Sequence, residues 1–339
     1  MLKLSIKVSQ MQTAQAALLE RTAPIYDRVR NVIPAIEWPF FAPDIEAILR
    51  LKRERNAIIL AHNYQTPEIF HGVADIVGDS LALAREAATA KADVIVLAGV
   101  HFMAETAKLL NPSRTVLIPD DSAGCSLASS ITAEDVRLLK QRYPGVPVVA
   151  YVNTSADVKA ECDICCTSGN AKKVVESLGV PRVIMLPDRY LARNIAAQTT
   201  VEIIAWEGAC EVHERFTPAD IATIRQSHPN VVVLAHPECP PEVVAVADYA
   251  GSTAGMVDFV AQKRPARVAL ITECSMSDNV AAQYPDIEFV RPCNLCPHMK
   301  QITLPKIRHA LETMSFEVTV PDHIAEAARR SVERMIAIG

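Results

Sequence analysis

Three cysteines recur at nearly equal intervals along the chain. Cys125, Cys210 and Cys296 lie 85 and 86 residues apart. Each is followed by a threonine seven positions later and by a branched aliphatic residue eleven positions later, so the spacing reflects an internal repeat. Three thiolates can hold three irons of a four-iron, four-sulfur cluster and leave one iron free to bind a substrate oxygen as a Lewis acid. The spacing therefore predicts a [4Fe-4S] site at these three cysteines.

Two other interpretations of the three cysteines stay open. Small apolar thiols can fill equivalent core positions in three repeats, because free cysteine is among the most buried residue types. Zinc is the lesser metal option, since a structural zinc site would need a fourth protein ligand such as His213 or His298. The nine cysteines are an odd number, and the first residues lack the pattern of a secretory signal, so a disulfide framework is not expected.

The remaining cysteines give weaker signals. Residues 162, 165 and 166 are cysteines with redox or metal spacing, and Cys293 precedes Cys296 by three positions. A disulfide between Cys293 and Cys296 would remove one cluster ligand. Cys239 and Cys274 are expected in the core.

A second repeated feature supplies polar side chains. Apolar runs at 56–61, 146–150 and 231–235 have the composition of strands buried on both faces of a parallel sheet. The polar residues that follow these runs are His62, Tyr64, Tyr151, Asn153, His236 and Glu238. Ligands of open parallel sheets bind at the carboxyl ends of the strands, so we expect these six residues to line one central cavity.

Helical patterns lie between the apolar runs. In the first repeat they cover 71–90 and 103–110, before strands predicted at 92–98 and 115–118. This alternation predicts βαβ units with right-handed crossovers. We therefore expect an α/β fold of three pseudo-threefold-related, three-layer αβα domains, each with a small parallel sheet, around a central iron–sulfur cluster.

The repeat also sets the predicted domain boundaries. Residues 1–40 form an N-terminal helical extension, in which the Trp-Pro-Phe-Phe sequence from Trp38 onward packs against the body. The three α/β repeats occupy 41–131, 132–216 and 217–302. Residues 303–339 form a helix, a short strand at 316–320 and a closing helix, and this segment is expected to pack back on the first repeat.

Hydroxyl side chains stand where helices are expected to begin. They are Ser80, Ser168, Ser252 and Thr253. Free backbone N–H groups and the helix dipole favour phosphate or carboxylate at such positions. Ordinary N-capping explains the same residue types, and both roles can hold at once.

Seven ordered motifs lie between about residues 40 and 305. They are His62-Asn-Tyr64-Gln, Gly78-Asp-Ser80, Tyr151-Val-Asn153, Cys166-Thr-Ser168-Gly-Asn170, Gly208-Ala-Cys210-Glu-Val-His213, His236-Pro-Glu238-Cys239 and Gly251-Ser252-Thr253. Together these motifs resemble the quinolinate synthase family of NAD biosynthesis. The resemblance implies a [4Fe-4S] cluster held by Cys125, Cys210 and Cys296. It also implies a transferase reaction that condenses iminoaspartate with dihydroxyacetone phosphate to quinolinate, with release of phosphate and two waters.

The implied reaction gives the cavity residues their expected roles. Enolisation, bond formation and two dehydrations all move protons near a carbonyl, and Tyr64 and Glu238 are the acid/base candidates. An enclosed cavity is expected to raise the pKa of Glu238 toward neutrality. The other expected catalytic residues are His62, His236, Asn153 and Tyr151, with Asn153 directed toward the open iron. The expected substrate-binding residues are His62, Ser80, Tyr151, Asn153, Ser168, His236, Glu238, Ser252 and Thr253.

Two alternative functions also use an iron–sulfur cluster. An aconitase-type hydro-lyase has an open iron, but it would need a different chain plan and substrate-binding arginines. A sensor or electron carrier would have a fully ligated or exposed cluster and no use for a cavity lined by histidine and glutamate.

Composition narrows the range of partners. A chain of 339 residues that is 50% hydrophobic can bury a large core. The net charge of −5, without long runs of one sign, argues against nucleic acid as a partner. No stretch reaches the roughly 18 apolar residues of a membrane span, so we expect a cytoplasmic enzyme with no membrane contact. An aspartate oxidase or dehydrogenase that produces iminoaspartate is a candidate transient partner.

Overall fold

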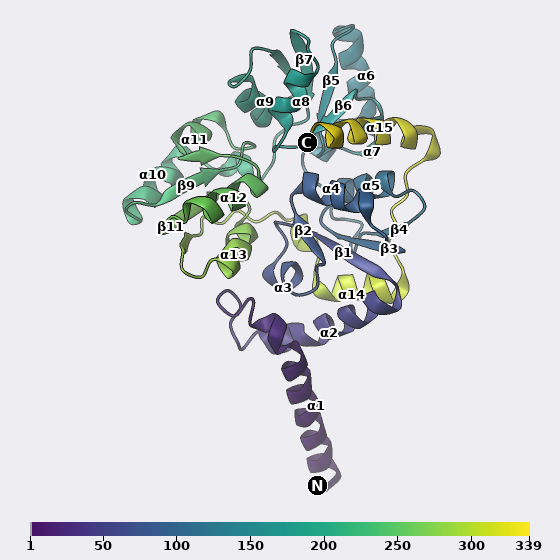
Figure 1. Ribbon diagram of the computed structural model, residues 1–339, viewed down its shortest axis with the longest axis vertical. Coiled ribbons are helices and arrows are strands. Elements are labelled where there is room, and N and C mark those ends of the chain that lie inside the picture. Colours follow the sequence, from purple (N-terminus) through teal and green to yellow (C-terminus); the bar gives the residue numbers. More distant parts are fainter. Residues whose placement is uncertain (1) are drawn as a thin grey trace.

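The structure is a computed structural model that describes residues 2–339, with side chains from residue 12 onward. Helix α1 (Leu2–Tyr26) projects from the body as a stalk, and α2 (Trp38–Glu54) lies where the stalk meets the body (Figure 1). Trp38 is buried, and its indole N–H donates to Thr22 Oγ1 at 3.1 Å. Phe40 was expected to pack against the body together with Trp38, but its side chain is 77% exposed.

Three four-stranded sheets form the body, as the alternating pattern predicts. The first contains β1 (Ala57–His62), β2 (Ile76–Gly78), β3 (Val94–Ala98) and β4 (Thr115–Leu117). The second contains β5 (Val148–Tyr151), β6 (Ile164–Cys166), β7 (Arg182–Leu186) and β8 (Glu202–Ala205). The third contains β9 (Val232–Ala235), β10 (Tyr249–Ala250), β11 (Arg267–Ile271) and β12 (Glu288–Val290). All pairings within these sheets are parallel, and each sheet has its first strand between the second and the third.

Helices flank each sheet, and we call a sheet with its helices a unit. The first unit has α3 (Pro67–Phe70), α4 (Ser80–Thr89) and α5 (His101–Leu110). The second has α6 (Ala133–Arg142), α7 (Ala156–Ala160), α8 (Ala171–Ser177) and α9 (Arg189–Ala196). The third has α10 (Pro218–Ser227), α11 (Pro241–Val246), α12 (Thr253–Lys263) and α13 (Cys274–Gln283). This α/β architecture agrees with the three αβα domains expected from the sequence.

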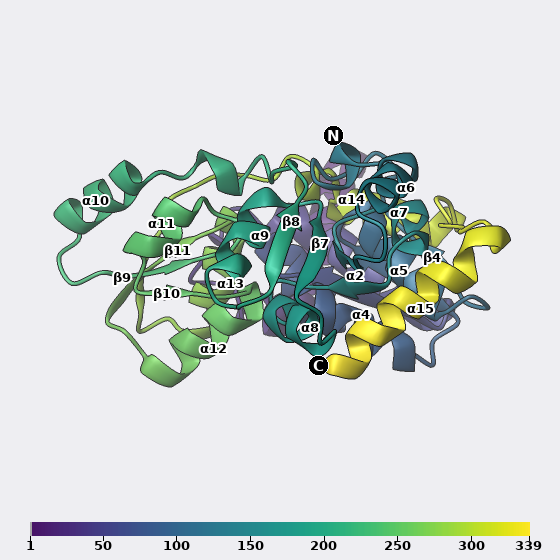
Figure 2. The same cartoon turned by 90° about the horizontal axis from the view of Figure 1, so that it is seen from above.

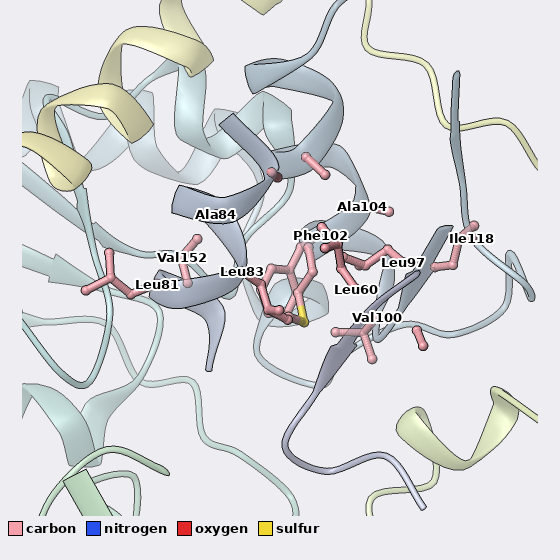
Figure 3. Packing of buried hydrophobic residues seen from close by; sticks show 14 of the residues in the cluster. Leu60, Leu81, Leu83, Ala84, Leu97, Val100, Phe102, Ala104, Ile118 and Val152 are labelled. Atoms are coloured by element: carbon pink, nitrogen blue, oxygen red, sulfur yellow. The ribbon is translucent and has the colours of Figure 1, made fainter. Parts of the chain in front are cut away.

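The core of the first unit shows why these strands carry no alternating polar residues. Leu60 of β1 and Leu97 of β3 pack with Leu83 of α4 and Phe102 of α5 (Figure 3). Every residue of β3 is buried, because helices cover both faces of the sheet. Burial of each such side chain contributes about 1.5–3 kcal/mol. The rigid packing brings Phe102 to the wall of the cavity described below.

The repeat around each cysteine is a local structural module. The carbonyl oxygen of each cysteine accepts a hydrogen bond from the N–H group four residues later, at 3.0 to 3.2 Å. A short 3₁₀ helix begins three residues after each cysteine, as η1 (Ala128–Ser130), η2 (His213–Arg215) and η3 (Met299–Gln301). The same turn therefore presents the thiol in all three places.

The threonine seven positions after each cysteine begins the next helix. Thr132 and Thr217 accept the N–H groups of Asp135 and Asp220, whose carboxylates accept the threonine N–H groups in return. Such capping boxes satisfy two backbone donors at once. Thr303 also caps its helix, α14 (Leu304–Thr313), but a lysine stands where the aspartate would. The third copy of the pattern therefore lacks the carboxylate half of the capping box.

Two expected elements differ from the structure. Residues 71–90 do not form one helix, because 76–78 pair with β1 as strand β2 and the helix is confined to α4. The segment 316–320 makes only an isolated antiparallel bridge, between Leu117 and Glu317. Phe316 has a φ of 61°, a left-handed conformation that does not continue a strand.

The C-terminal segment contacts more than the first unit. Helix α14 packs against α2, whereas α15 (Asp322–Ile338) lies along α7 and β6 of the second unit and also contacts α5 of the first. Seen from above, α15 runs along one side of the molecule (Figure 2). Among the helices of residues 2–339, none is both long and apolar enough to cross a membrane.

Candidate active site

One cavity collects side chains that follow the first strand of every sheet. His62 ends β1 with Tyr64 beyond it, Tyr151 ends β5 with Asn153 beyond it, and His236 and Glu238 follow β9. The three sheet ends therefore meet at one place, as the position of the polar residues predicts. The cavity wall also includes Ser80, Ser168, Thr253, Cys125, Cys210 and Cys296.

The expected helix-start hydroxyls take different positions. Ser80 is the first residue of α4 and Thr253 the first residue of α12, and both line the cavity. Ser168 precedes α8 by three residues and instead lies 3.3 Å from His236 Nε2. Ser252 caps α12 by accepting the Gly255 N–H group and lines a neighbouring groove, not the cavity. The expectation that Ser168 begins a helix is therefore wrong, whereas the substrate-binding role expected for Ser252 stays a prediction.

His62 and His236 have equivalent geometry in the first and third units. In each case the N–H group two residues later donates to Nδ1 of the histidine, at 3.2 Å for Tyr64 and 3.3 Å for Glu238. An Nδ1 that accepts a hydrogen bond leaves the ring proton on Nε2. Burial lowers the pKa of His62 to about 4 and that of His236 to about 3. Both side chains are therefore neutral hydrogen-bond donors at neutral pH.

Glu238 lies at the centre of the polar network and is 4% exposed. Its Oε1 accepts a hydrogen bond from Tyr151 Oη, and its Oε2 lies 2.9 Å from Nδ1 of His213. Burial by itself would raise the pKa of Glu238, but the charge interaction with His213 and the hydrogen bonds from His213 and Tyr151 outweigh it and hold the pKa below its usual range. The expected shift toward neutrality is therefore wrong, because the hydrogen-bond donors favour the carboxylate.

The two tyrosines of the cavity are protonated. Burial raises the pKa of both Tyr64 and Tyr151 well above the usual value, and the negative charge of Glu238 adds to the effect. The Tyr64 hydroxyl lies 2.6 Å from Oγ1 of Thr272, and its ring meets that of His62 edge to face at 4.6 Å. The cavity therefore combines a carboxylate base with phenolic acids.

The three repeated cysteines face the same cavity, and all nine cysteines of the chain are free thiols. Burial raises the pKa of Cys125 to about 12, and it raises the pKa of Cys210 and Cys296 as well. Three soft sulfur donors in one enclosed place, without a lysine or arginine among the described cavity residues, fit a cationic thiophilic metal group. Asn153 Oδ1 is buried there without a hydrogen-bond partner in the structure, which leaves an oxygen free for a ligand.

A second donor set overlaps with the cysteines. Cys210, His213 and Glu238 bring ligand atoms within 4.8 Å of one another, which supplies three of the four ligands of a tetrahedral zinc site. His213 is already engaged on both ring nitrogens, by Glu238 on one side and by Thr272 at 2.9 Å on the other. This set also leaves Cys125 and Cys296 without a role, and the cluster interpretation uses all three thiols.

Comparison with known proteins decides the family. The family model described as "Quinolinate synthetase A protein" matches residues 46–337. The chain belongs to the quinolinate synthase family. Its relatives include quinolinate synthase 2 of Mesorhizobium japonicum, 75% identical over 314 residues that cover 93% of this chain and 97% of the relative. Quinolinate synthases of Agrobacterium fabrum (72% identical, covering 93% of this chain and 92% of the relative) and Caulobacter vibrioides (61%, covering 93% and 87%) also match.

In this member of the quinolinate synthase family, one group of polar residues next to the cavity was not predicted from the sequence. Thr272 and Glu273 follow β11, the third strand of their sheet, and both are fully buried. Lys300 Nζ lies 2.9 Å from Oε1 of Glu273. The predicted cavity residues lie at the ends of the first strands, at helix starts and at the repeated cysteines, and none lies at the end of a third strand. The polar pair directly after the apolar strand at 267–271 is the signal that could have revealed this group.

Proposed function

We propose that the chain condenses iminoaspartate with dihydroxyacetone phosphate to form quinolinate, with release of phosphate and two waters, in NAD biosynthesis. Family membership supports the product. The observation that carries the proposal is the single cavity in which three thiols, a carboxylate base and phenolic acids meet. A transferase of this kind needs a binding group for a substrate oxygen next to groups that exchange protons.

Cys125, Cys210 and Cys296 are the residues proposed to hold a [4Fe-4S] cluster. When bound through three thiolates, such a cluster supplies one iron as a Lewis acid for a substrate hydroxyl or carboxylate. Asn153 lies in the same wall with an unpartnered buried oxygen and is the proposed neighbour of that substrate group. A sensor or electron carrier would not need this enclosed polar wall.

The proton transfers are assigned to Glu238 and Tyr64. Glu238 is a carboxylate, and it is proposed to take a proton from the carbon next to the substrate carbonyl. Tyr64 is a protonated phenol and is proposed to give a proton to a departing hydroxyl group. The neutral Nε2–H groups of His62 and His236 are proposed to donate hydrogen bonds to substrate oxygens.

Backbone and hydroxyl donors are proposed to bind the anionic substrate groups. Ser80 and Thr253 open α4 and α12, helices of 10 and 11 residues whose first N–H groups are unpaired within the helix. Ser168 and Tyr151 add hydroxyl groups in the same wall. Because the described cavity wall has no lysine or arginine, these neutral donors would carry phosphate and carboxylate recognition. We further propose that the enzyme acts in the cytoplasm, close to the enzyme that releases iminoaspartate.

A spectroscopic titration tests the open coordination site. A dicarboxylate that carries a thiol or hydroxyl on the adjacent carbon is added to the anaerobic, cluster-loaded protein while the Mössbauer spectrum is recorded. We expect the signal of one iron to change and activity to fall in parallel, because the mimic occupies the position of the substrate. The same dicarboxylate without the thiol or hydroxyl is the control and should leave that signal unchanged.

The alternative outcome is equally specific. If the spectrum is indifferent to the mimic and the cluster resists loss of iron in air, a fourth protein ligand is present. His213 and Cys293 are then the nearest candidates, and Lewis-acid chemistry at the cluster would have to be abandoned.

A further inference from the structure

Two turns of the same shape carry Tyr64 and Glu238. In the turns 62–65 and 236–239, the N–H group of the fourth residue donates to the carbonyl oxygen of the first residue, a histidine, at 2.9 Å. The third residue is Tyr64 in one turn and Glu238 in the other, and its N–H group donates to the ring of that histidine. These bonds do not use the carbonyl groups on either side of Tyr64 and Glu238.

An asparagine of the second unit binds the turn that carries Glu238. Nδ2 of Asn194, on α9, donates to the carbonyl oxygens of Pro237 at 2.8 Å and of Cys239 at 2.9 Å. These two carbonyl groups flank Glu238, and Asn194 is buried. Both protons of one side-chain amide therefore hold the turn across the boundary between the second and third units.

The third unit makes the same contact with the first. Nδ2 of Asn279, on α13, donates to the carbonyl oxygens of Asn63 at 3.0 Å and of Gln65 at 2.7 Å, which flank Tyr64. Asn194 and Asn279 lie 85 residues apart, and each is the sixth residue of its helix. The internal repeat that spaces the cysteines therefore also spaces these two amides.

The helices that carry the two asparagines are anchored alike. Each begins after a buried acidic residue that follows the third strand of its sheet. Asp188 accepts the N–H groups of Tyr190 at 2.8 Å and of Leu191 at 2.9 Å. Glu273 accepts the N–H group of Ser275 at 2.8 Å. An amide on such a capped helix is a rigid support for the turn that it binds.

The boundary between the first and second units lacks this asparagine. The sixth residue of α5 is Thr106, whose hydroxyl donates to a carbonyl group of its own helix. The chain after β5 also turns differently, because the Thr154 N–H group donates to the carbonyl oxygen of Val152 at 2.8 Å. Lys159 of the same unit donates to the carbonyl oxygen of Thr154. The amide contact thus accompanies only the two turns that carry an assigned proton-transfer residue.

We propose that Asn194 and Asn279 are positioning residues of the active site, each of which fixes the proton-transfer residue of another unit. Asn194 acts on Glu238, and Asn279 acts on Tyr64. Neither asparagine belongs to the described cavity wall, so both act through the turns and not by contact with the substrate. The role rests on the proposed function only in so far as Glu238 and Tyr64 transfer protons.

Hydrogen–deuterium exchange tests the contact independently of activity. In Asn194→Leu, which has no amide donor, the N–H groups of residues 238–239 in the anaerobic, cluster-loaded protein should exchange about tenfold faster or more. Those of residues 64–65 should keep the rate of the parent protein. Asn279→Leu should give the reverse pattern. Faster exchange only in the helix that carries the replacement, or equally in both turns, would overturn the proposal.

Activity is expected to fall through kcat and not through KM. Asn194→Leu should lower kcat by about tenfold or more and change KM by less than about threefold, because a small displacement of a proton-transfer group is costly. Asn194→Asp keeps the shape of the side chain, cannot donate as a carboxylate, and should cause the same loss. The kcat of the parent protein in either folded variant would contradict the positioning role.

Asn111→Leu is the matched control. Nδ2 of Asn111 donates to the carbonyl oxygens of Ala87 at 2.7 Å and of Ala107 at 3.1 Å, both within the first unit, and Asn111 is buried. Its replacement removes an equal number of hydrogen bonds and should lower Tm to a similar degree, with kcat and exchange in both turns unchanged. If Asn111→Leu lowers kcat as much as Asn194→Leu does, the effect is general destabilisation and the proposal is wrong.

A double-mutant cycle tests whether Asn194 acts through Glu238. In a Glu238→Gln background, Asn194→Leu should cause no further loss of kcat, whereas an equal loss in both backgrounds would overturn the proposal. Iron and sulfide content should be the same in every variant. Unchanged exchange at 238–239 in Asn194→Leu would contradict positioning, whether or not the protein forms quinolinate. Absence of quinolinate together with the expected exchange pattern would overturn only the assigned reaction.

Discussion

Replacement of Cys210 by alanine is expected to abolish both cluster binding and quinolinate formation. The thiol lies in the cavity wall with Cys125 and Cys296, and the same backbone turn presents all three. Removing one of only three sulfur ligands leaves two irons without protein ligands, so the cube should not assemble stably. Iron and acid-labile sulfide per chain, measured after anaerobic purification, should fall to the level of an unloaded protein. Cys125→Ala and Cys296→Ala should behave in the same way.

Cysteines outside the cavity provide matched controls. Cys239 and Cys274 are buried but do not line the cavity. Cys239→Ala and Cys274→Ala should retain iron, sulfide and activity, with at most a modest loss of stability from the smaller side chain. Full cluster occupancy in Cys210→Ala would mean that the repeated cysteines fill core positions and that the metal has other ligands.

Glu238→Gln is expected to lower turnover by on the order of 10² or more while fold and cluster are retained. Glutamine has nearly the same shape and can still accept the hydrogen bond of Tyr151, but it cannot take up a proton. Tyr64→Phe should have a loss of similar size, because it removes the phenolic donor. Both variants are measured by steady-state kinetics under anaerobic conditions, with iron content as the check on the cluster.

The control for the glutamate is Glu242→Gln. Glu242 is exposed in the first turn of α11, four residues after Glu238. Its replacement should leave turnover unchanged. If Glu238→Gln and Tyr64→Phe also turn over at the parent rate, the proton transfers belong to other cavity residues, and the assignment of Glu238 as base is wrong.

The strand ends and the cysteines could be predicted because both recur in each copy of the internal repeat. Runs without polar alternation indicate strands buried on both faces, and the residue after each run reaches the open edge of a parallel sheet. The thiols of Cys125, Cys210 and Cys296 share one local turn, so their equivalence appears in the spacing alone. Local rules thus place the polar strand ends and the thiols of the cavity wall, but not wall residues such as Phe102, Glu211 and Met299.

The remaining features depend on contacts between distant parts of the chain. Thr272 and Lys300 reach Tyr64 only after the first and third units pack together, and no periodicity links residues separated by more than 200 positions. The lowered pKa of Glu238 has the same origin, since the partners His213 and Tyr151 come from the second unit. Burial alone predicts a raised pKa, and the charge interaction with His213, together with the hydrogen bonds from His213 and Tyr151, reverses it.

The short strand β2 is missed for a related reason. Residues 71–90 contain apolar residues at helical spacing, but 76–78 gain hydrogen bonds to β1 that no local pattern shows. Helix α4 therefore begins only after this strand, at Ser80. Asp79 caps it, and the Asp79 carboxylate accepts the Ala82 N–H group. Sheet pairing outweighs helical propensity over these three residues.

The most direct test is the formation of quinolinate by the anaerobically purified protein. Iminoaspartate, generated in place from oxaloacetate and ammonia, is supplied with dihydroxyacetone phosphate, and quinolinate and free phosphate are quantified together. We predict equal amounts of the two products, in proportion to the fraction of chains that carry four irons and four sulfides, and none from Cys210→Ala. Quinolinate formed at full rate by protein without iron, or no quinolinate from fully loaded protein, would contradict the proposed function.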